Sequence, residues 1–236
     1  MSHPRRAWPA PGGPRRRSVS AVALCALLVA GLPVTGAHAA APEAAAVVAD
    51  VASGAVRRMV GWIVASGDND GSPFAIVDKT AAEVRVFDAR GRPLGGAPAL
   101  LGSASGDDST PDIGTRRLSS IRPEERTTPA GRFTVSIGEN LQGREILWID
   151  YGMALSLHPV IAGQPREQRA RRLASARPRD RRISYGCVNV PVDFYERIVS
   201  PTFTGTSGVV YILPETRSLA QVFPMLAPDP DRPRER

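Results

Sequence analysis

The feature that most limits the fold of this chain is a series of short stretches in which apolar and polar residues alternate. Phe133, Val135 and Ile137 alternate with threonine and serine, a pattern typical of a half-buried strand. Residues 146–151 form a nearly continuous apolar run, which favours a central strand. Many short strands separated by turns predict a mainly β architecture, a sandwich or a partly closed barrel with a few short helices. The other predicted strands are residues 75–78, 83–87, 97–102, 153–158 and 208–213.

Two segments have helical periodicity instead. Residues 42–65 carry valine, methionine and isoleucine at spacings of three and four, which predicts an amphipathic helix weakened at Gly54. A shorter helix is expected after Pro191. Its predicted buried side comprises Phe194, Tyr195, Ile198 and Val199. A long polar loop is expected between residues 103 and 126.

The first 39 residues have the pattern of a secretory signal peptide. A basic stretch that includes Arg15–Arg17 precedes the apolar residues 19–32, and small residues around Ala39 suit a signal peptidase. The apolar stretch is shorter than a membrane-spanning helix requires. We therefore expect an exported protein of the periplasm or cell envelope, with no stable transmembrane span after cleavage. An uncleaved membrane anchor is the alternative.

Cleavage of this segment would change what the composition implies. The whole chain has a net charge of +7, but residues 1–39 hold five arginines and no acids, so the remainder carries only +2. The high isoelectric point therefore belongs largely to the signal, and nucleic-acid binding is not expected. We predict a signal peptide (1–39), an N-terminal helix and linker (40–72), one main domain (73–217) and a disordered tail (218–236), because the tail is rich in proline and charge.

Beyond residue 39 the chain keeps one cysteine, Cys187, and one histidine, His158. A lone cysteine in an exported protein cannot form an internal disulfide, so it is free, paired to another chain, or catalytic. The same scarcity argues against a structural zinc site, which needs more cysteine and histidine ligands. Neither a metal nor a cofactor is expected.

These two residues suit nucleophilic catalysis by a cysteine. Such chemistry requires a thiolate, a base that generates it, and N–H donors for the oxyanion that forms on attack. His158 is the only imidazole left to act as the base. Its alternation with Leu155 and Leu157 places it on the opposite face of the strand from those apolar side chains. Gly186, directly before the cysteine, allows a substrate to approach the backbone closely.

The residues around the cysteine resemble the active-site motif of the YkuD-type L,D-transpeptidases. In that motif Ser/Thr-His-Gly-Cys is followed by a hydrophobic residue and Asn or Arg. The matching positions here are Ser184, Gly186, Cys187, Val188 and Asn189. Upstream, residues 128–133 (Thr-Pro-Ala-Gly-Arg-Phe) are similar to the family's Thr-Pro-x-Gly-x-Phe motif, and residues 205–213 resemble its closing strand. The resemblance covers residues 74–214, most of a single domain.

The resemblance implies an L,D-transpeptidase-like catalytic domain over residues 73–217, acting on peptidoglycan stem peptides. Cys187 would be the nucleophile and His158 its base, and the N–H groups of Gly186 and Cys187 would form the oxyanion hole. The implied reaction attacks the bond between the L-centre and D-Ala of a tetrapeptide stem, releases D-Ala and leaves an acyl-enzyme. An amine of a neighbouring stem would then form a 3→3 cross-link. With water as acceptor, the enzyme would be an L,D-carboxypeptidase.

Two departures from the family pattern affect these expectations. Tyr185 replaces a second histidine, and because a phenol ionises well above neutral pH, we expect it to donate a hydrogen bond or line the pocket. The interval between His158 and Ser184 is longer than usual, and residues 166–182 hold eight arginines against two acids. This segment is predicted to be either a flap that attracts the carboxylates of stem peptides, with Arg182 as a substrate contact, or a solvated surface insertion.

Three classes of function therefore fit these residues. The first is an L,D-transpeptidase or carboxypeptidase of the cell wall. The second is a non-catalytic peptidoglycan-binding module that retains the fold, which Tyr185 makes credible. The third is another cysteine peptidase or amidase of the envelope. An inert buried Cys187 is disfavoured by its small and polar neighbours. Ser184 is disfavoured as a nucleophile because no acidic residue is placed to complete a triad, and it is expected to hydrogen-bond within the loop.

Overall fold

The computed structural model describes residues 52–161 and 163–226. The expected signal peptide, the first part of the expected helix over residues 42–65 and the last ten residues of the expected tail lie outside these ranges. Within them, no helix combines the length and the apolar character needed to cross a membrane.

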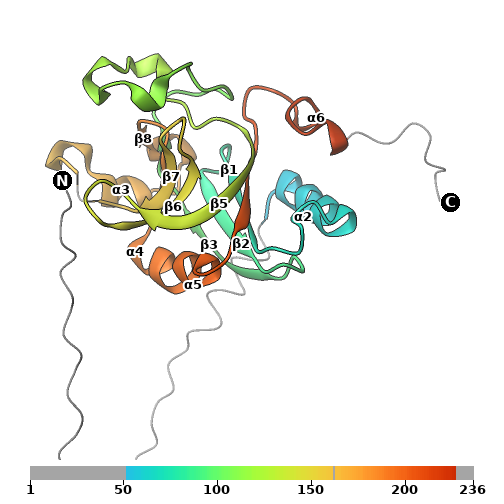
Figure 1. The fold of residues 1–236 in the computed structure, drawn as a ribbon. Coiled ribbons are helices and arrows are strands. Elements are labelled where there is room, and N and C mark those ends of the chain that lie inside the picture. The colour runs from blue at the N-terminus through green and yellow to red at the C-terminus, as the bar shows by residue number, and fades with distance from the viewer. Residues whose placement is uncertain (1–51, 162, 227–236) are drawn as a thin grey trace, which may run out of the picture. The chain divides into compact units, whose positions relative to one another are not determined.

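The described elements are mostly short strands joined by helical turns (Figure 1). The strands are β1 (Phe74–Asp78), β2 (Glu83–Phe87), β3 (Pro93–Pro98), β4 (Leu101–Gly102), β5 (Gly131–Glu139), β6 (Glu145–Asp150), β7 (Leu155–Pro159), β8 (Arg182–Ser184), β9 (Val188–Val190) and β10 (Gly208–Ile212). The α-helices are α2 (Gly54–Ser66), α3 (Arg169–Leu173), α4 (Val192–Phe194), α5 (Ser200–Phe203) and α6 (Leu219–Val222). The 3₁₀ turns are η1 (Ile113–Thr115), η2 (Leu118–Ser120), η3 (Pro123–Glu125), η4 (Pro165–Glu167), η5 (Pro178–Arg181) and η7 (Pro224–Leu226), and η6 (Tyr195–Val199) is a π-helical turn.

Eight of the strands form one sheet in the order β3-β2-β1-β10-β5-β6-β7-β9, and its two edges meet. Leu100, just after β3, exchanges two backbone hydrogen bonds with Asn189 of β9, with N···O distances of 2.8 and 2.9 Å. β4 pairs in parallel with β8 to form a separate two-stranded sheet. The predicted mainly β architecture is therefore confirmed, and of the two predicted forms the structure has the partly closed barrel and not the sandwich.

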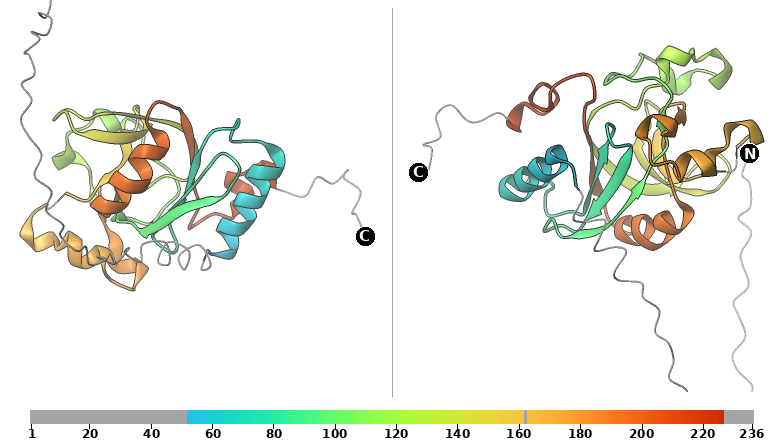
Figure 2. Two further views of the ribbon diagram at one scale, coloured as in Figure 1. Left: turned by 90° about the horizontal axis from the view of Figure 1, so that it is seen from below. Right: turned by 180° about the vertical axis from the view of Figure 1, so that it is seen from behind.

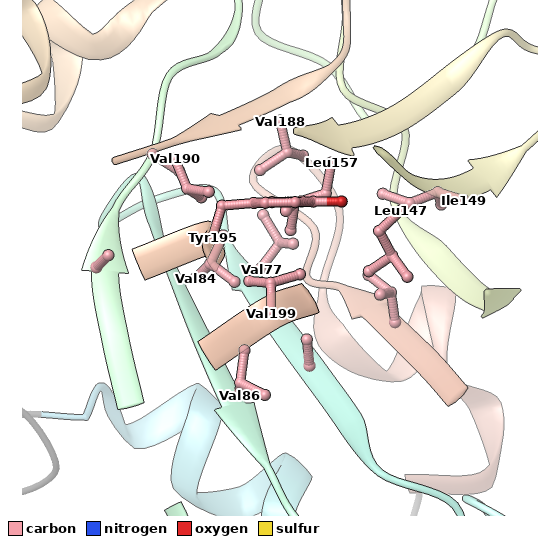
Figure 3. Packing of buried hydrophobic residues seen from close by; sticks show 14 of the residues in the cluster. Val77, Val84, Val86, Leu147, Ile149, Leu157, Val188, Val190, Tyr195 and Val199 are labelled. Atoms are coloured by element: carbon pink, nitrogen blue, oxygen red, sulfur yellow. The ribbon is translucent and has the colours of Figure 1, made fainter. Parts of the chain in front are cut away.

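Alternate strand side chains and one helical segment fill the interior of this barrel (Figure 3). On β7, Leu155 and Leu157 belong to the interior core. The segment from α4 through α5 contributes Tyr195 and Val199 to the same core, as predicted for the helix after Pro191. The remaining interior residues labelled in Figure 3 are Val77, Val84, Val86, Leu147, Ile149, Val188 and Val190.

α2 covers the outer face of β1 and β10, on a different side of these strands from α4 and α5 (Figures 1 and 2). Met59 and Ile63 of this helix pack in one cluster with Phe74 and Tyr211. Because helices cover both faces, all five residues of β1 are buried. The helix begins at Gly54, after Ser53 caps its first turn by accepting a hydrogen bond from Val56 N at 3.2 Å.

The C-terminal segment differs from its prediction. Residues 218–236 were expected to be disordered, but Leu219–Val222 and Pro224–Leu226 are helical, and Phe223 is only 1% exposed. The Phe223 ring packs beside Tyr211 with a centroid distance of 6.3 Å. A single aromatic residue in a proline-rich, charged stretch shows no periodicity. The sequence therefore contained no sign that Phe223 packs against Tyr211.

Candidate active site

Cys187 and His158 lie next to each other where β7 meets β9. These strands are parallel, with His158 opposite Asn189 and Leu157 opposite Val188. Cys187 directly precedes β9, so this register places it beside Ser156, whose Oγ lies 3.5 Å from Sγ of Cys187. The thiol of Cys187 donates to the carbonyl of Ala154 at 3.5 Å, and its ionisation is coupled to that of the His158 imidazole. The structure thus brings together the two residues that elimination had paired.

The two groups shift each other's ionisation in opposite directions. Burial disfavours the charged form of both, but their mutual hydrogen bond and attraction outweigh it. The pKa of the Cys187 thiol is therefore lowered and the pKa of the His158 imidazole is raised. Hydrogen bonds from Ser156 to the sulfur add to the lowering. A thiol in such surroundings can form the thiolate that acts as a nucleophile.

A chain of hydrogen bonds orients the His158 ring. Nδ1 lies 2.8 Å from the carbonyl oxygen of Pro159, and because a carbonyl only accepts, Nδ1 carries the proton. Nε2 lies 3.0 Å from Nδ2 of Asn189. Oδ1 of Asn189 accepts from Nη1 of Arg169 at 2.8 Å, and Nε of Arg169 donates to Oε2 of Glu167 at 2.7 Å. The arginine-rich segment therefore reaches the imidazole through Asn189.

The loop that carries the cysteine is held by two side-chain hydroxyls. Ser184 Oγ donates to the carbonyl of Cys187 at 2.7 Å and accepts from Gly186 N at 3.1 Å, so Ser184 does hydrogen-bond within the loop. Thr128 Oγ1 donates to the carbonyl of Gly186 at 2.7 Å. Gly186 has a φ of +137°, and a Cβ there would lie 2.8 Å from the carbonyl oxygen of Thr127, so this position requires glycine.

Tyr185 connects this loop to the polar loop that contains η1, η2 and η3. The guanidinium of Arg126 lies 4.2 Å from the centre of the Tyr185 ring, a cation–π contact. Arg126 also donates from Nη2 to the carbonyl of Ile121 at 3.0 Å. Tyr185 lines a cavity together with Cys187, which is one of the two roles expected for it.

Two cavities with separate linings border the cysteine–histidine pair. The smaller cavity, about 120 Å³, is lined by Cys187, Gly186 and Tyr185 and by residues of η1 and η2. The larger cavity, about 640 Å³, has His158 and Ser156 in its lining and extends along β6 to the β5–β6 turn. Ser156 and His158 lie on the cavity side of β7, as the alternation predicts, because Leu155 and Leu157 face the core.

Arg182, predicted as a substrate contact, lies elsewhere. Its guanidinium pairs with Glu215 and donates to the carbonyl of Lys79 at 3.0 Å, and it lines neither cavity. The arginine-rich segment is also not a uniformly solvated insertion. Arg181 is 8% exposed and donates to the carbonyl of Ala82 at 3.1 Å. The guanidinium groups of Arg181 and Arg182 donate to backbone carbonyls of the domain, which holds both side chains in place.

Three residues of the site were not identified from the sequence. Ser156 shares the strand face of His158, so the alternation contained the signal for it. Thr128 belongs to the Thr-Pro-Ala-Gly motif, but its hydrogen bond to Gly186 depends on the tertiary structure. Arg169 is one of eight arginines in its segment, and no local pattern distinguishes it from the others.

The fold and the site define a barrel-like β protein with a cysteine–histidine pair at the junction of the sheet edges. Solved structures of L,D-transpeptidases, the family that the motif around Cys187 resembles, are similar to this chain. The helical cell shape determining protein Pgp2 from Campylobacter jejuni has a TM-score of 0.43 and 13% identity, over 70% of this chain and 58% of that one. The L,D-transpeptidase from Mycobacterium smegmatis has a TM-score of 0.34 and 15% identity, over 60% of this chain and 58% of that one. The catalytic domain of the E. faecium L,D-transpeptidase has a TM-score of 0.33 and 16% identity, over 61% of this chain and 98% of that one.

The matched part spans less than two thirds of the Pgp2 and M. smegmatis chains. No family sequence profile matches this chain, and no curated protein sequence does.

Proposed function

We propose that this chain is a peptidoglycan L,D-transpeptidase of the cell envelope that acts through an acyl-enzyme on Cys187. The observation that carries the proposal is the thiol–imidazole pair with opposite pKa shifts, in which Cys187 lines one cavity and His158 lines another. A thiolate is the nucleophile that acyl transfer from an amide requires. Two separate approaches allow an acyl donor and an acyl acceptor to be bound at once, which is what a transpeptidase needs and a simple hydrolase does not.

In the proposed first step, the thiolate of Cys187 attacks the carbonyl carbon that precedes the terminal D-Ala of a tetrapeptide stem. A carbon–sulfur bond forms, and the negative charge moves to the carbonyl oxygen. The tetrahedral intermediate collapses, the carbon–nitrogen bond breaks, and the imidazolium of His158 gives its proton to the departing amine of D-Ala. The product of this half-reaction is a thioester on Cys187.

In the second step, an amine of another stem attacks the thioester. The neutral imidazole of His158 takes a proton from this amine, the carbon–sulfur bond breaks, and the thiolate is restored. The new amide is the 3→3 cross-link. Water in place of the amine gives a free tripeptide acid, which is the carboxypeptidase outcome.

The neighbouring residues have supporting roles in this proposal. The carbonyl oxygen of Pro159 holds the imidazole in the Nδ1-protonated form, so Nε2 is the nitrogen that exchanges the proton, and it would give up its contact with Nδ2 of Asn189 to do so. The N–H groups of Gly186 and Cys187 are the proposed oxyanion donors. The N–H of Gly186 donates to Ser184 Oγ in this structure, so it would exchange that acceptor for the oxyanion.

The test is to incubate the full chain and its Cys187→Ala variant with disaccharide-tetrapeptide and to analyse the products by mass spectrometry. A cross-linked dimer formed by the wild type alone supports the transpeptidase, and tripeptide with free D-Ala supports the carboxypeptidase mode. An adduct on Cys187 that lacks the mass of D-Ala identifies the acyl-enzyme. A folded wild-type chain that gives neither product nor adduct would contradict the proposal and favour a binding module. Cleavage at another bond would favour a different peptidase or amidase.

A further inference from the structure

A stacked aromatic pair stands beside the larger cavity. The rings of Trp148 and Tyr151 have a centroid distance of 4.5 Å and an interplanar angle of 25°. Trp148 lines the cavity, whereas Tyr151 does not and is 68% exposed. Tyr151 therefore stacks on one face of the indole, and the indole borders the cavity.

Contacts with strand β5 fix the position of the Trp148 indole. Its Nε1 donates to the carbonyl of Glu139 at 3.3 Å. It packs over Gly138 on β5, where a Cβ would lie only 2.9 Å from Cδ1 of the ring. Leu147 and Ile149, its neighbours on β6, face the core instead. The fold thus holds an ordered tryptophan outside the hydrophobic core, where core packing does not account for it.

The aromatic pair lies two strands from the candidate nucleophile. Trp148 of β6 is directly paired with Ser156 of β7, and Ser156 Oγ lies 3.5 Å from Sγ of Cys187. Neighbouring strands are about 4.8 Å apart, so the backbone of Trp148 is roughly 10 Å from that of Cys187. Ser156 and His158, the neighbours of Cys187, line the same cavity as Trp148, whereas Cys187 itself lines the smaller cavity.

The cavity combines this flat apolar surface with hydrogen-bonding side chains. Asn140, Gln142 and Arg144 of the β5–β6 turn line its far end, and the last two are exposed. A pyranose ring has the matching chemistry, because its C–H groups form an apolar face while hydroxyl and N-acetyl groups project from its edge. The exposed side chains of Gln142 and Arg144 can hydrogen-bond such groups.

We propose that Trp148, backed by Tyr151, is a subsite for a sugar ring of the glycan strand that carries the reacting stem. This proposal rests on the proposed function. In a tetrapeptide stem the attacked carbonyl belongs to the third residue, and the sugar is attached to the first. Three extended residues span about 10 Å at roughly 3.5 Å each. This length matches the separation of roughly 10 Å between the backbones of Cys187 and Trp148. The larger cavity is therefore the site of the acyl donor's sugar-bearing end.

The test uses the full chain with Cys187→Ala, which prevents turnover. Three probes are compared: the peptide-free disaccharide of N-acetylglucosamine and N-acetylmuramic acid, the free tetrapeptide, and the disaccharide-tetrapeptide. Saturation-transfer NMR detects contact with the sugar protons, and calorimetry measures affinity. The variants Trp148→Ala and Trp148→Phe are compared with Leu141→Ala, a fully exposed residue that lines the same cavity.

We expect the sugar to increase affinity about tenfold over the free tetrapeptide, which is the order of one aromatic stacking contact. Trp148→Ala should remove this gain and the transfer to sugar protons, Trp148→Phe should keep most of it, and Leu141→Ala should keep all of it. The affinity for the free tetrapeptide should stay the same in every variant. The absence of a gain, or a gain that persists in folded Trp148→Ala, would overturn the subsite.

The two proposals fail in distinguishable ways. Product formed by the wild type without any effect of sugar or of Trp148 would overturn the subsite and leave the transpeptidase standing. Disaccharide bound through Trp148 without any reaction of a stem peptide would support the subsite and contradict the proposed reaction.

Discussion

The side-chain amide of Asn189 links His158 to Arg169. Its Nδ2 lies 3.0 Å from Nε2 of His158, and its Oδ1 accepts from Nη1 of Arg169 at 2.8 Å. A guanidinium only donates, so the atom that faces Arg169 must be the amide oxygen. Arg169 therefore sets the orientation of the amide and directs the NH₂ group to the imidazole. One residue of the arginine-rich segment thereby acts on the candidate base without touching it.

Arg169→Met should raise the pKa of His158 and make Cys187 react at lower pH. The amide NH₂ and the positive charge of Arg169 both favour the neutral imidazole, so their loss favours the imidazolium. A more readily protonated imidazole stabilises the thiolate. The rate of alkylation by iodoacetamide in mildly acidic buffer should rise about threefold, since a partly exposed charge contributes about 0.5–1 kcal/mol.

This alkylation is followed on the Cys187 peptide by mass spectrometry, because the full chain also contains Cys25. The matched control is Arg171→Met, which lies on the same short helix, is exposed, and hydrogen-bonds only to Gln168 among the contacts described for it. Equal pH profiles for the two variants would show that Arg169 has no special influence on His158.

The pH dependence of the thiol should itself depend on His158. In the wild type the pKa of Cys187 is lowered, so alkylation should reach its half-maximum below the pH at which an ordinary cysteine does. In His158→Gln the stabilising partner is lost and burial remains, which raises the pKa of the thiol. The half-maximum should then move to or above the ordinary value. Superimposable profiles from folded samples would refute the pairing of these two groups.

Tyr185 should act through its ring and not through its hydroxyl. Tyr185→Phe keeps the surface under Arg126, so product formation should stay within about twofold of the wild type. Tyr185→Ala removes the contact that connects the cysteine loop to the loop of η1–η3, and kcat/KM should fall about tenfold. Limited proteolysis of residues 103–126 should become faster in the alanine variant alone. An equal loss of activity in both variants would instead assign a chemical role to the hydroxyl.

Much of the site could be predicted from the sequence because it depends on local rules. Period two is a property of the extended backbone, so the burial of Leu155 and Leu157 already implied that Ser156 and His158 face away from the core. The pairing of Cys187 with His158 followed from composition, since residues 40–236 hold no other cysteine or histidine.

The parts that could not be predicted depend on contacts between distant segments. β8 and β9, which flank Cys187, have three residues each, too few to show a period. The closure of the barrel by Leu100 and Asn189 has no local signature. In the same way, the eight arginines of residues 166–182 have no local feature that distinguishes one from another. Only the folded structure shows that Arg169 hydrogen-bonds to Asn189. Long-range geometry, and not residue type, decides these cases.

Lys79, the single lysine of the chain, should be essential for stability. Its ammonium is buried and donates to Oδ1 of Asp107 at 2.7 Å and to the carbonyl of Thr128 at 2.8 Å. Lys79→Met would leave the buried carboxylate of Asp107 without its closest opposite charge, which we expect to cost about 3 kcal/mol of unfolding free energy. Urea unfolding of the full chain at neutral pH measures this loss.

The hydrogen bonds around Asp107 also determine how the stability loss in Lys79→Met depends on pH. Burial raises the pKa of Asp107, but hydrogen bonds from Lys79, Thr216 and the backbone outweigh it, so the net pKa is lowered. Its contribution to stability is therefore present above the ordinary carboxyl value, near 3.9, and disappears as pH falls through the depressed folded-state value. Lys79→Met removes the strongest of the lowering bonds, so the pKa of Asp107 rises and the variant should begin to lose stability at a higher pH than the wild type.

The control for both measurements is Arg92→Met. Arg92 forms an ion pair of 2.6 Å with Asp88, but its side chain is 75% exposed, so its removal should cost less than about 0.5 kcal/mol. If Lys79→Met lowered the free energy of unfolding no more than Arg92→Met does, the buried Lys79–Asp107 pair would contribute no more to stability than an exposed ion pair. A clear difference would also bear on the site, because Lys79 holds the carbonyl of Thr128 while the hydroxyl of Thr128 holds Gly186. Alkylation of Cys187 should then change in Lys79→Met and stay unchanged in Arg92→Met.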